Sequence, residues 1–557
     1  MNLETQIYKH ALKNACTHDG KAQIGPVINK IIGEFPEIKE KIGEIGKKVK
    51  AIVDEVNKMS LEEQKKRLLE IWPDALEKKE ELPKELVLPD AEIGKVVLRL
   101  APFPSGPLHL GNAKTYLLNA ICAEKYKGKL YFVMDDTISS EEKAIVPEAY
   151  KLIPEGFEWL NVKWDGDIIY KSDRLELYYD FAKKIIEKGK AYVCKCSQDV
   201  LRENRAKGIE CEHRNQSVEE TMKEFEKMIA GEYKEGEAVL RLKTDMKHPN
   251  PAFRDRVLIR ICEREHPRVG KKHKAWPLLE LTWAYDDYAL GVTHILRGKD
   301  LMMESEVCKY IWNLLGIKPP KIIHLGLIQI EGVKISKSKA QKEVMRGVYS
   351  GWDDPRTWSL QSLRRRGIQP EAIREFVESI GINEHDITVP IEKLYAINRK
   401  IIDEKCNRYF FVENSVKIKI DNLKECVVNV FYYPGKNERG FKEYKFKEDE
   451  YVFLPYSEVK NNISKIIRLK DAFAIKIYEE GKAEFVDTSD LSMPKIQWVT
   501  KDNIPCKVVM PDGEVKQGLV EKYIEREDVG SLVQFERFGY ARLDSKGKEY
   551  VFYYAHP

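Results

Sequence analysis

The 557-residue sequence lacks any apolar run of the roughly 18 residues that a membrane-spanning helix needs. Its first residues also lack the basic and then apolar pattern of a secretory signal peptide. The net charge is only +4, from 94 basic and 90 acidic side chains, so the total charge by itself does not indicate a nucleic-acid partner. These absences predict a cytoplasmic protein with no membrane partner.

The ten cysteines do not resemble a disulfide framework, because most stand alone in apolar contexts, as at Cys122 and Cys262. One group differs: a Cys-x-Cys pair is followed, within 20 residues, by a Cys-x-His pair. Its members are Cys194, Cys196, Cys211 and His213. Thiolate and imidazole ligands in this number suit a tetrahedral structural zinc ion, although paired cysteines are also found as plain core residues.

The length predicts several domains, because 557 residues exceed what one hydrophobic core supports. Up to about residue 82, apolar residues recur at the helical period. Predicted strands and helices then alternate, as in a doubly wound α/β sheet. After residue 407, runs in which apolar and polar residues alternate indicate β-strands. The predicted domains are an N-terminal helical appendage at 1–90, an α/β domain at 91–330 with an insert at about 192–275, a helical domain with a Lys-Ser loop at 331–405, and β-barrels at 406–557.

Two short motifs far apart in the chain are the most informative features. Residues 104–112 (PSGPLHLGN) follow a buried-strand pattern and precede a helix, whose free N-terminal amides can bind an anion. There His109 can donate to a phosphate oxygen, while ammonium groups from residues 334–338 (KISKS) approach the same phosphates. Each motif alone is weak. Together they predict a nucleoside triphosphate site that activates a carboxylic acid by attack on the α-phosphate.

These motifs resemble the HIGH and KISKS signatures of class I aminoacyl-tRNA synthetases. Further segments, in the matching order, resemble glutamyl-tRNA synthetases of the archaeal type, within the glutamyl/glutaminyl subfamily. They are Arg99, Asp135-Asp136-Thr137, DDYALGVTH at 286–294 ahead of Arg297, GWDDPR at 351–356, LRRRG at 363–367, AINRK at 396–400 and VQFERFG at 533–539. The resemblance covers nearly the whole chain.

The resemblance implies a Rossmann-like catalytic domain, an insert that binds the tRNA acceptor end, and C-terminal barrels that bind the anticodon. The implied activity is that of a glutamate-tRNA ligase, which uses ATP with Mg²⁺ to form glutamyl-adenylate and transfers L-glutamate to the 3′ end of tRNA(Glu). Whether tRNA(Gln) is charged as well stays open. We expect a monomer.

The resemblance also implies roles for individual residues. Those expected at the ATP site are Pro104, Gly106, His109, Gly111, Asn112, Ile335, Ser336, Lys337 and Ser338. Among the motif residues, the catalytic groups are expected to be His109, Lys334 and Lys337. Glutamate is expected to contact Arg99, Asp135 and Arg297. The expected tRNA contacts are Asp353, Arg356, Arg364, Arg365 and Arg366, although without the family the arginine trio suits a charged helix end equally well.

The sequence also departs from the family. Asn112 replaces the second histidine of the HIGH motif, and three pocket positions are Val133, Leu279 and Trp283 where the family has arginine, an aromatic hydroxyl and often a polar residue. These changes predict a more apolar pocket, in which a buried carboxylate loses about 1 to 3 kcal/mol per unmade hydrogen bond. Either neighbouring groups compensate, or the chain is a paralogue with another amino acid or acceptor. A third hypothesis, a tRNA-binding protein without turnover, conflicts with the intact motifs and Arg297.

Overall fold

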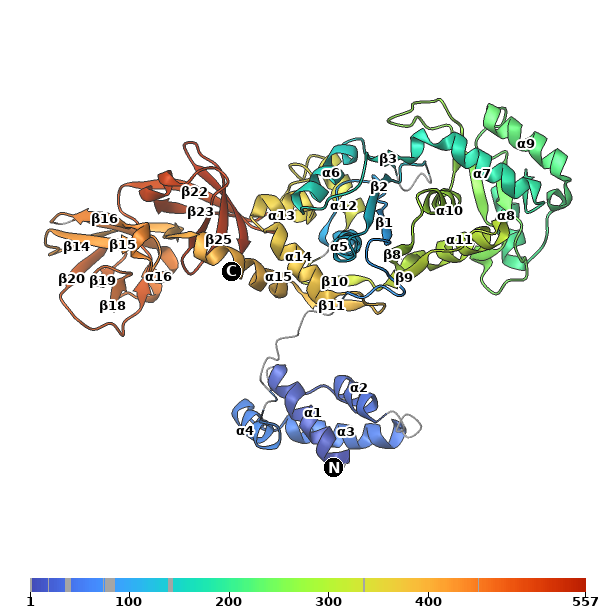
Figure 1. Cartoon of the computed structure of the whole chain (residues 1–557). Helices are drawn as coiled ribbons and strands as arrows, with labels where there is room; N and C mark the ends of the chain where they lie inside the picture. The colour runs from blue at the N-terminus through green and yellow to red at the C-terminus, as the bar shows by residue number, and fades with distance from the viewer. Residues whose placement is uncertain are drawn as a thin grey trace. The chain divides into compact units, whose positions relative to one another are not determined.

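The computed structural model describes residues 3–18, 20–35, 42–73, 75, 86–138, 144–333, 336–448 and 450–557. The chain forms two compact units, Met1–Leu82 and Pro83–Pro557 (Figure 1). Within these described ranges, no helix combines the length and the apolar character needed to cross a membrane. The finer division of the second unit into catalytic, inserted, helical and barrel domains stays a prediction.

The first unit is a small helical domain. Its helices are α1 (Leu3–Thr17), α2 (Ile24–Glu34), α3 (Ile42–Val56) and α4 (Leu61–Ile71). Helix α4 begins where the Ser60 side chain accepts a hydrogen bond from the backbone N–H of Glu63 at 3.2 Å, an N-cap that satisfies one free donor of the first turn. Side chains spaced at helical period, among them Ile7, Ile31 and Val49, are buried together and form the core of this unit.

The second unit begins with a parallel sheet. Strands β1 (Val97–Leu100), β2 (Lys129–Met134) and β3 (Ile169–Tyr170) pair in parallel, with Leu98 opposite Leu130 and Val133 opposite Ile169. The parallel pair β8 (His294–Gly298) and β9 (Lys321–Leu325) lies next to β1, because Thr293 donates its backbone N–H to Val97 O at 3.0 Å. The carboxyl ends of these strands therefore meet at one edge, where ligands bind in open α/β sheets.

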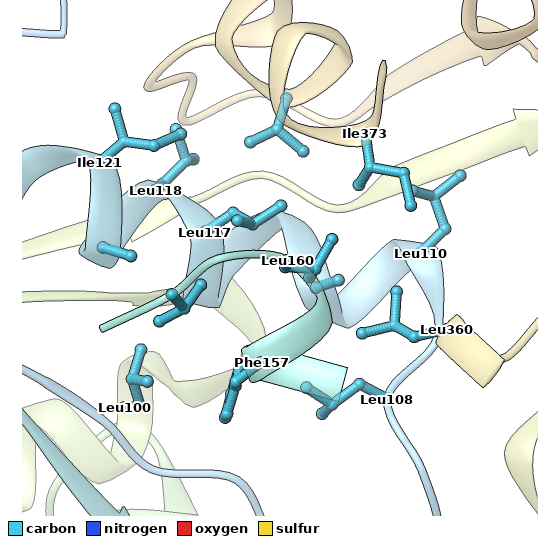
Figure 2. Close-up of a cluster of buried hydrophobic side chains, with 14 of the residues drawn as sticks. Leu100, Leu108, Leu110, Leu117, Leu118, Ile121, Phe157, Leu160, Leu360 and Ile373 are labelled. Carbon is cyan, nitrogen blue, oxygen red and sulfur yellow. The ribbon is translucent and has the colours of Figure 1, made fainter. Parts of the chain in front are cut away.

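Apolar helices cover this sheet. They are α5 (Leu110–Lys125), α6 (Ala149–Trp159), α13 (Leu360–Arg366) and α14 (Pro370–Ile380). Figure 2 shows Leu117 and Leu118 of α5 among Phe157 of α6, Leu360 of α13 and Ile373 of α14. This single cluster of buried side chains links segments from residues 86 to 397, so the start of α5 is held rigidly against the sheet.

An antiparallel sheet with its own helices is inserted after β3. Its strands are β4 (Ala191–Cys194), β5 (Val239–Leu242), β6 (Val257–Ile261) and β7 (Ala275–Pro277), in that spatial order. The accompanying helices are α7 (Leu175–Glu187), α8 (Gln198–Lys207), α9 (Val218–Ala230), α10 (Leu279–Ala289) and α11 (Met302–Leu315). Helix α10 follows β7 of this sheet and leads to β8 of the parallel sheet. Its Trp283 lines the cavity described below.

The chain then crosses a helical segment and ends in barrel-like sheets, as the alternating pattern predicts. The connecting elements are β10 (Ile328–Glu331), α12 (Lys337–Met345), β11 (Ile387–Pro390) and α15 (Ile391–Ile402). A seven-stranded sheet contains β12 (Asn407–Tyr409), β13 (Phe411–Glu413), β22 (Asn503–Val509), β23 (Val515–Glu521), β24 (Leu532–Phe535), β25 (Gly539–Ser545) and β26 (Tyr550–His556).

A six-stranded sheet forms the second barrel-like body. It contains β14 (Ser415–Asp421), β17 (Tyr451–Pro455), β18 (Ile466–Leu469), β19 (Ala474–Glu479), β20 (Lys482–Val486) and β21 (Lys495–Ile496), and is accompanied by the hairpin β15 (Cys426–Phe431) and β16 (Phe441–Phe446) and by α16 (Tyr456–Asn461). Aromatic and aliphatic side chains such as Trp498, Phe410 and Phe446 fill its core, so these rings are not available to stack on RNA bases.

The arginine trio on α13 is not one surface, and the expected tRNA contact by Arg366 is wrong. Its side chain is fully buried: Nε donates to Tyr554 O at 3.1 Å, and Nη2 donates to Ala555 O at 2.7 Å and to the Tyr395 hydroxyl at 3.0 Å. A side chain that satisfies buried carbonyls has no access to a phosphate. Only Arg364 of the trio is exposed.

The two arginines provide a matched test of this correction. We expect Arg366→Met to destabilise the second unit by about 3 kcal/mol, because the buried carbonyls of β26 lose their donors. The exposed Arg364→Met variant removes the same charge and is expected to leave the thermal unfolding midpoint unchanged. Differential scanning calorimetry of both variants checks this. Equal midpoints for the two variants would contradict the structural role of Arg366.

Candidate functional site

His109 is the N-cap of α5 and is held there by reciprocal hydrogen bonds. Its Nδ1 accepts from the backbone N–H groups of Gly111 at 3.1 Å and Asn112 at 3.4 Å, and Asn112 Oδ1 accepts from the backbone N–H of His109 at 2.8 Å. Asn112 therefore completes the cap at the position where the family has a second histidine. Because Nδ1 accepts, a neutral imidazole carries its proton on Nε2, which is then a donor.

The state of this histidine is set by its surroundings. Burial and, to a smaller extent, the positive charge of Lys337 together lower the pKa of His109 to about 4. The ring is therefore neutral at physiological pH and donates a hydrogen bond without carrying a charge. A Cβ at Gly111 would approach the ring to 3.1 Å, so only glycine leaves the ring its present position.

The structure brings the second motif to the first. Lys337 opens α12, whose N-cap is Ser336 with its side chain accepting from the backbone N–H of Lys339 at 3.3 Å. Burial lowers the pKa of Lys337 to about 8, and its charge acts on His109. Ser338 is exposed. Lys334 and Ile335 lie outside the described residues.

A cavity of about 320 Å³ lies beside these groups at the carboxyl ends of β1 and β8. Its walls come from β1, α5, α10, β8 and the segment 326–328; they include Arg99, His109, Gly111, Asn112, Tyr116, Trp283, Arg297 and Asp300. Two other expected ATP-site residues, Pro104 and Gly106, lie on the motif loop, and their contact with a nucleotide stays a prediction. Pro104 O accepts from the backbone N–H of Val146 at 2.8 Å, and a Cβ at Gly106 would come within 2.9 Å of the Trp352 ring.

Arg297 is the least compensated charge in this cavity. Its side chain is 6% exposed, and none of its three guanidinium nitrogens has a hydrogen-bond partner among the described residues. The nearest carboxylate oxygen, Asp287 Oδ2, lies 3.8 Å from Nη2, and burial lowers the pKa of the guanidinium. A buried cation in this condition is stabilised by an anion that enters the cavity.

Arg99 and Asp135, the other two expected amino-acid contacts, are already paired. Nε and Nη2 of Arg99 donate to the two oxygens of Asp287, with Nη2 at 3.0 Å from Oδ2. The carboxylate of Asp135 lies 2.9 Å from Lys171 Nζ. Sequence reasoning missed Lys171, because a lysine between a short strand and a turn looks like a surface residue; only the strand register reveals its position.

Trp283 has a different role from the one the sequence suggested. Its buried ring lies 4.4 Å from the guanidinium carbon of Arg297 and 5.0 Å from that of Arg99, measured to the ring centroid. The electron-rich face of an indole attracts such cations, so this residue supports charge rather than making the pocket simply apolar. Of the other two departures, Val133 is buried and Leu279 is half-buried against a core cluster, and neither is among the residues that line the cavity.

Two further acidic residues organise the neighbouring loops. Asp286 accepts from the Tyr178 hydroxyl at 2.8 Å and pairs with Arg174 at 3.0 Å. Asp136 accepts from the hydroxyls of Ser172 at 2.7 Å and Tyr150 at 3.0 Å. Asp136 and Asp286 belong to the sequence segments 135–137 and 286–294, which resemble the family, but the sequence predicts no separate role for either residue. Their signal in the sequence is the occurrence of two adjacent acids, of which one pairs with a buried cation beside the cavity and the other binds hydroxyl groups of a neighbouring segment.

The predicted metal ligands converge at the end of β4. The ligand atoms of Cys194, Cys196, Cys211 and His213 all lie within 4.8 Å of one another. The Sγ atoms of Cys194 and Cys211 are 3.7 Å apart, and Cys196 Sγ is 3.6 Å from His213 Nδ1.

A cation lies against this cluster. The buried Arg241 places Nη1 at 3.9 Å from the sulfur atoms of both Cys194 and Cys211. Hydrogen bonds with Cys194 and Tyr192, together with this charge, hold the pKa of the Cys211 thiol below its usual value.

Comparison with known proteins identifies the group to which these features belong. Residues 95–404 match the model of the tRNA synthetases class I (E and Q), catalytic domain, and residues 406–493 and 495–544 match two models of the anti-codon binding domain of the same group. The chain belongs to the class I tRNA synthetases of the E and Q group. It is 43% identical to the glutamate--tRNA ligase of Pyrococcus abyssi and 40% identical to that of Methanocaldococcus jannaschii, in each case over 100% of both chains.

A crystal structure of a glutamate tRNA ligase from Elizabethkingia meningosepticum, in complex with its amino acid, is also similar, with a TM-score of 0.41 and 18% identity over 56% of this chain and 70% of that chain.

The catalytic-domain match of the class I synthetases includes the remaining expected tRNA contacts. Arg356 pairs with Asp354 at 2.8 Å, and Arg365 bonds to Asp544 at 2.8 Å and to Asp353 at 3.0 Å. Arg356 and Arg365 are half-buried and Arg364 is exposed, and the contact of these residues and of Asp353 with tRNA stays a prediction.

The lowered pKa of Lys337 predicts how ATP affinity depends on pH. A lysine is charged below its pKa, so the attraction to the phosphates is present below about pH 8 and is lost as the pH rises through that value. We expect calorimetric ATP affinity to fall above about pH 8. Lys337→Arg is expected to remove this fall, because a guanidinium stays charged. The same fall in the arginine variant would assign the titration to another group.

Proposed function

We propose that this chain is a glutamate-tRNA ligase, which activates glutamate with ATP and transfers it to the 3′ end of tRNA(Glu). The observation that carries the proposal is the buried Arg297, whose guanidinium faces the cavity without a hydrogen-bond partner among the described residues. The names of the full-length relatives at 43% and 40% identity support the same activity.

The charge of Arg297 favours glutamate over glutamine. A side-chain carboxylate can accept two parallel hydrogen bonds from a guanidinium and neutralise it, whereas an amide accepts through one oxygen and leaves the cation uncompensated. Because the guanidinium is held on the face of Trp283, its plane is already oriented before a substrate arrives. Asp135 is the group that accepts from the substrate ammonium in this proposal, and Arg99 contacts a carboxylate.

The chemical step needs little from the protein beyond position and electrostatics. An α-carboxylate oxygen of glutamate attacks the α-phosphorus of ATP, the new bond forms a mixed anhydride, and the bond to the β-phosphate oxygen breaks to release pyrophosphate. No proton is transferred in this step. Neutral His109 donates from Nε2 and Lys337 adds a positive charge as charge develops on the phosphate oxygens. Mg²⁺ would neutralise the phosphates of the bound nucleotide.

The adenylate then reacts with a terminal hydroxyl of the tRNA ribose, which forms the ester and releases AMP. Charging of tRNA(Gln), the monomeric state and the cytoplasmic location stay predictions from the resemblance. The alternative of a paralogue with another amino acid is weakened by the structure, because Trp283 supports cations and because Val133 and Leu279 do not line the cavity.

We also infer that Cys194, Cys196, Cys211 and His213 hold a structural zinc ion. The sulfur–sulfur distance of 3.7 Å is close to that of a tetrahedral shell with zinc–sulfur bonds of about 2.3 Å. Three thiolates and a neutral imidazole around Zn²⁺ would carry one negative charge, and the buried Arg241 would neutralise it. The site lies in the inserted domain, away from the cavity, so its role is to hold β4 and the segment around residue 211 together.

This zinc assignment predicts a metal-dependent stability. We expect about one zinc ion per chain by elemental analysis of the purified protein. We also expect a lower unfolding temperature after chelation or in Cys196→Ser, because the metal ligands hold β4 and the segment around residue 211 together. Cys262→Ser changes a buried cysteine outside the cluster and is the matched control, with zinc content unchanged. Zinc-free protein with an unfolding temperature insensitive to chelators would contradict the assignment.

The activity itself is tested by amino-acid-dependent exchange of pyrophosphate into ATP, with all twenty amino acids and with and without tRNA. We expect exchange with glutamate, and Arg297→Ala is expected to raise the glutamate KM by about 100-fold while the ATP KM changes little, since a buried charged hydrogen bond is worth roughly 2 to 3 kcal/mol. Arg67→Met, on the exposed face of α4 in the first unit, is the control.

Exchange with a different amino acid would show that the pocket has another substrate. Equal increases in the glutamate and ATP KM values of Arg297→Ala would remove this residue from the recognition of the side-chain carboxylate. Tight tRNA binding without any exchange would support a binding protein without turnover.

A further inference from the structure

Lys171, which follows directly after β3, is a fully buried lysine next to the amino-acid pocket. Its Nζ lies 2.9 Å from Asp135 Oδ1 and donates to Thr282 Oγ1 at 2.8 Å. The ammonium group also lies 5.5 Å from the centroid of the Trp283 ring. Lysine is almost never fully buried unless it is paired, and here the carboxylate of Asp135 supplies the pairing.

The register of the parallel sheet brings Lys171 to Asp135. Strands β2 and β3 pair with Val133 opposite Ile169 and Met134 opposite Tyr170. Asp135 and Lys171 are the next residues of the two chains, so their side chains leave the sheet side by side at its carboxyl end. A cation is thereby supplied from β3, while the position two residues before Asp135 on β2 is the apolar Val133.

The charges that line and flank the pocket leave one excess positive charge, because Lys114 and Asp300, which also line the cavity, offset each other. Asp287 neutralises Arg99, Lys171 pairs with Asp135, and Arg297 has no carboxylate closer than 3.8 Å. The nearby Asp286 is paired with Arg174 at 3.0 Å. Glutamate, with one ammonium and two carboxylates, brings one net negative charge and balances this excess. Glutamine brings none.

Without Lys171 the balance would change in two ways. While Asp135 stays ionised, the excess positive charge is lost. If Asp135 is instead protonated, the charge count is restored but the anion beside the substrate ammonium is lost, because Asp135 is now a buried carboxylate without its ammonium partner. Such a group takes up a proton when its pKa rises above the solution pH, and a protonated carboxyl no longer attracts an ammonium. The charge of Asp135 also acts on Arg99 and Tyr116, both of which line the cavity, so its loss would be felt there.

We propose that Lys171 is a positioning residue for amino-acid recognition, which keeps Asp135 ionised beside the substrate ammonium and maintains the excess positive charge that selects a net-negative amino acid. This inference rests on the proposed function. Thr282 and Trp283 hold the lysine in place, the first through the hydrogen bond to its hydroxyl and the second through the face of its ring.

The test measures pyrophosphate exchange with the full-length protein and tRNA. Lys171→Met keeps the shape and removes the charge, and we expect it to raise the glutamate KM by about 30-fold with the ATP KM within about twofold. Lys171→Arg keeps the charge and is expected to restore most of the affinity. Lys442→Met removes another buried lysine that is paired with a carboxylate, Glu521 at 2.6 Å, in the barrel region, and it is the matched control for general damage.

The dependence on pH separates this role from simple loss of structure. In Lys171→Met the glutamate KM is expected to fall as the pH rises, because a higher pH favours the anionic carboxylate that attracts the substrate ammonium. In the wild type we expect no such change. A double variant, Asp135→Asn with Lys171→Met, removes both charges together and is expected to bind glutamate no more weakly than Asp135→Asn alone.

Three outcomes would overturn the proposal: an unchanged glutamate KM in folded Lys171→Met, a pH-independent loss that affects glutamate and ATP equally, or fully additive effects in the double variant. If Lys171→Met does not fold, the arginine variant and the charge-free double variant still decide between these outcomes. Absence of glutamate-dependent exchange in the wild type would refute the proposed function itself, whereas normal wild-type exchange with unaffected Lys171 variants refutes only this inference.

Discussion

Charges buried at the carboxyl end of the parallel sheet are the constraint on which this structure depends. A buried charge is costly unless an opposite charge or hydrogen bonds compensate it. The chain meets this cost with pairs formed across distant segments: Arg99 with Asp287, and Asp135 with Lys171. Arg297 is left with the least compensation, and Trp283 supports it from one side. The arrangement is stable enough to fold and still favours an anionic ligand, because one cation is not neutralised.

The short helix α13 connects this region to the C-terminal barrels. At its start, the backbone N–H of Leu360 donates to Leu108 O at 2.8 Å, one residue before His109. At its end, Arg366 donates to the carbonyls of β26, and Arg365 pairs with Asp544 of β25 at 2.8 Å. Arginines that looked like a phosphate-binding patch therefore hold two parts of the molecule together. The loop that carries His109 and the barrel sheet are attached to opposite ends of one rigid element.

Much of the architecture follows from local patterns. Alternating and helical periodicities predicted a helical start, an α/β sheet and a region of β-barrels, because the burial of apolar faces imposes those periods. The cysteine and histidine spacing likewise predicted a cluster that the structure forms. The same reasoning failed for Arg366 and for Trp283. A guanidinium on a helix end and an indole in a pocket have no fixed role in a sequence, since burial and the neighbouring groups decide whether each binds a carbonyl, a phosphate or a cation.

The sequence by itself determined the arrangement of chemical groups at the start of α5, the expected ATP site. His109, Gly111 and Asn112 are contiguous, and the hydrogen bonds of a helix N-terminus form between near neighbours, so their arrangement is a local property. Only the tertiary structure decided which charges of the amino-acid pocket are paired. That outcome depends on the register of β2 against β3 and on the approach of α10 to β1, and such contacts between distant segments arise from packing of the whole core rather than from any local pattern.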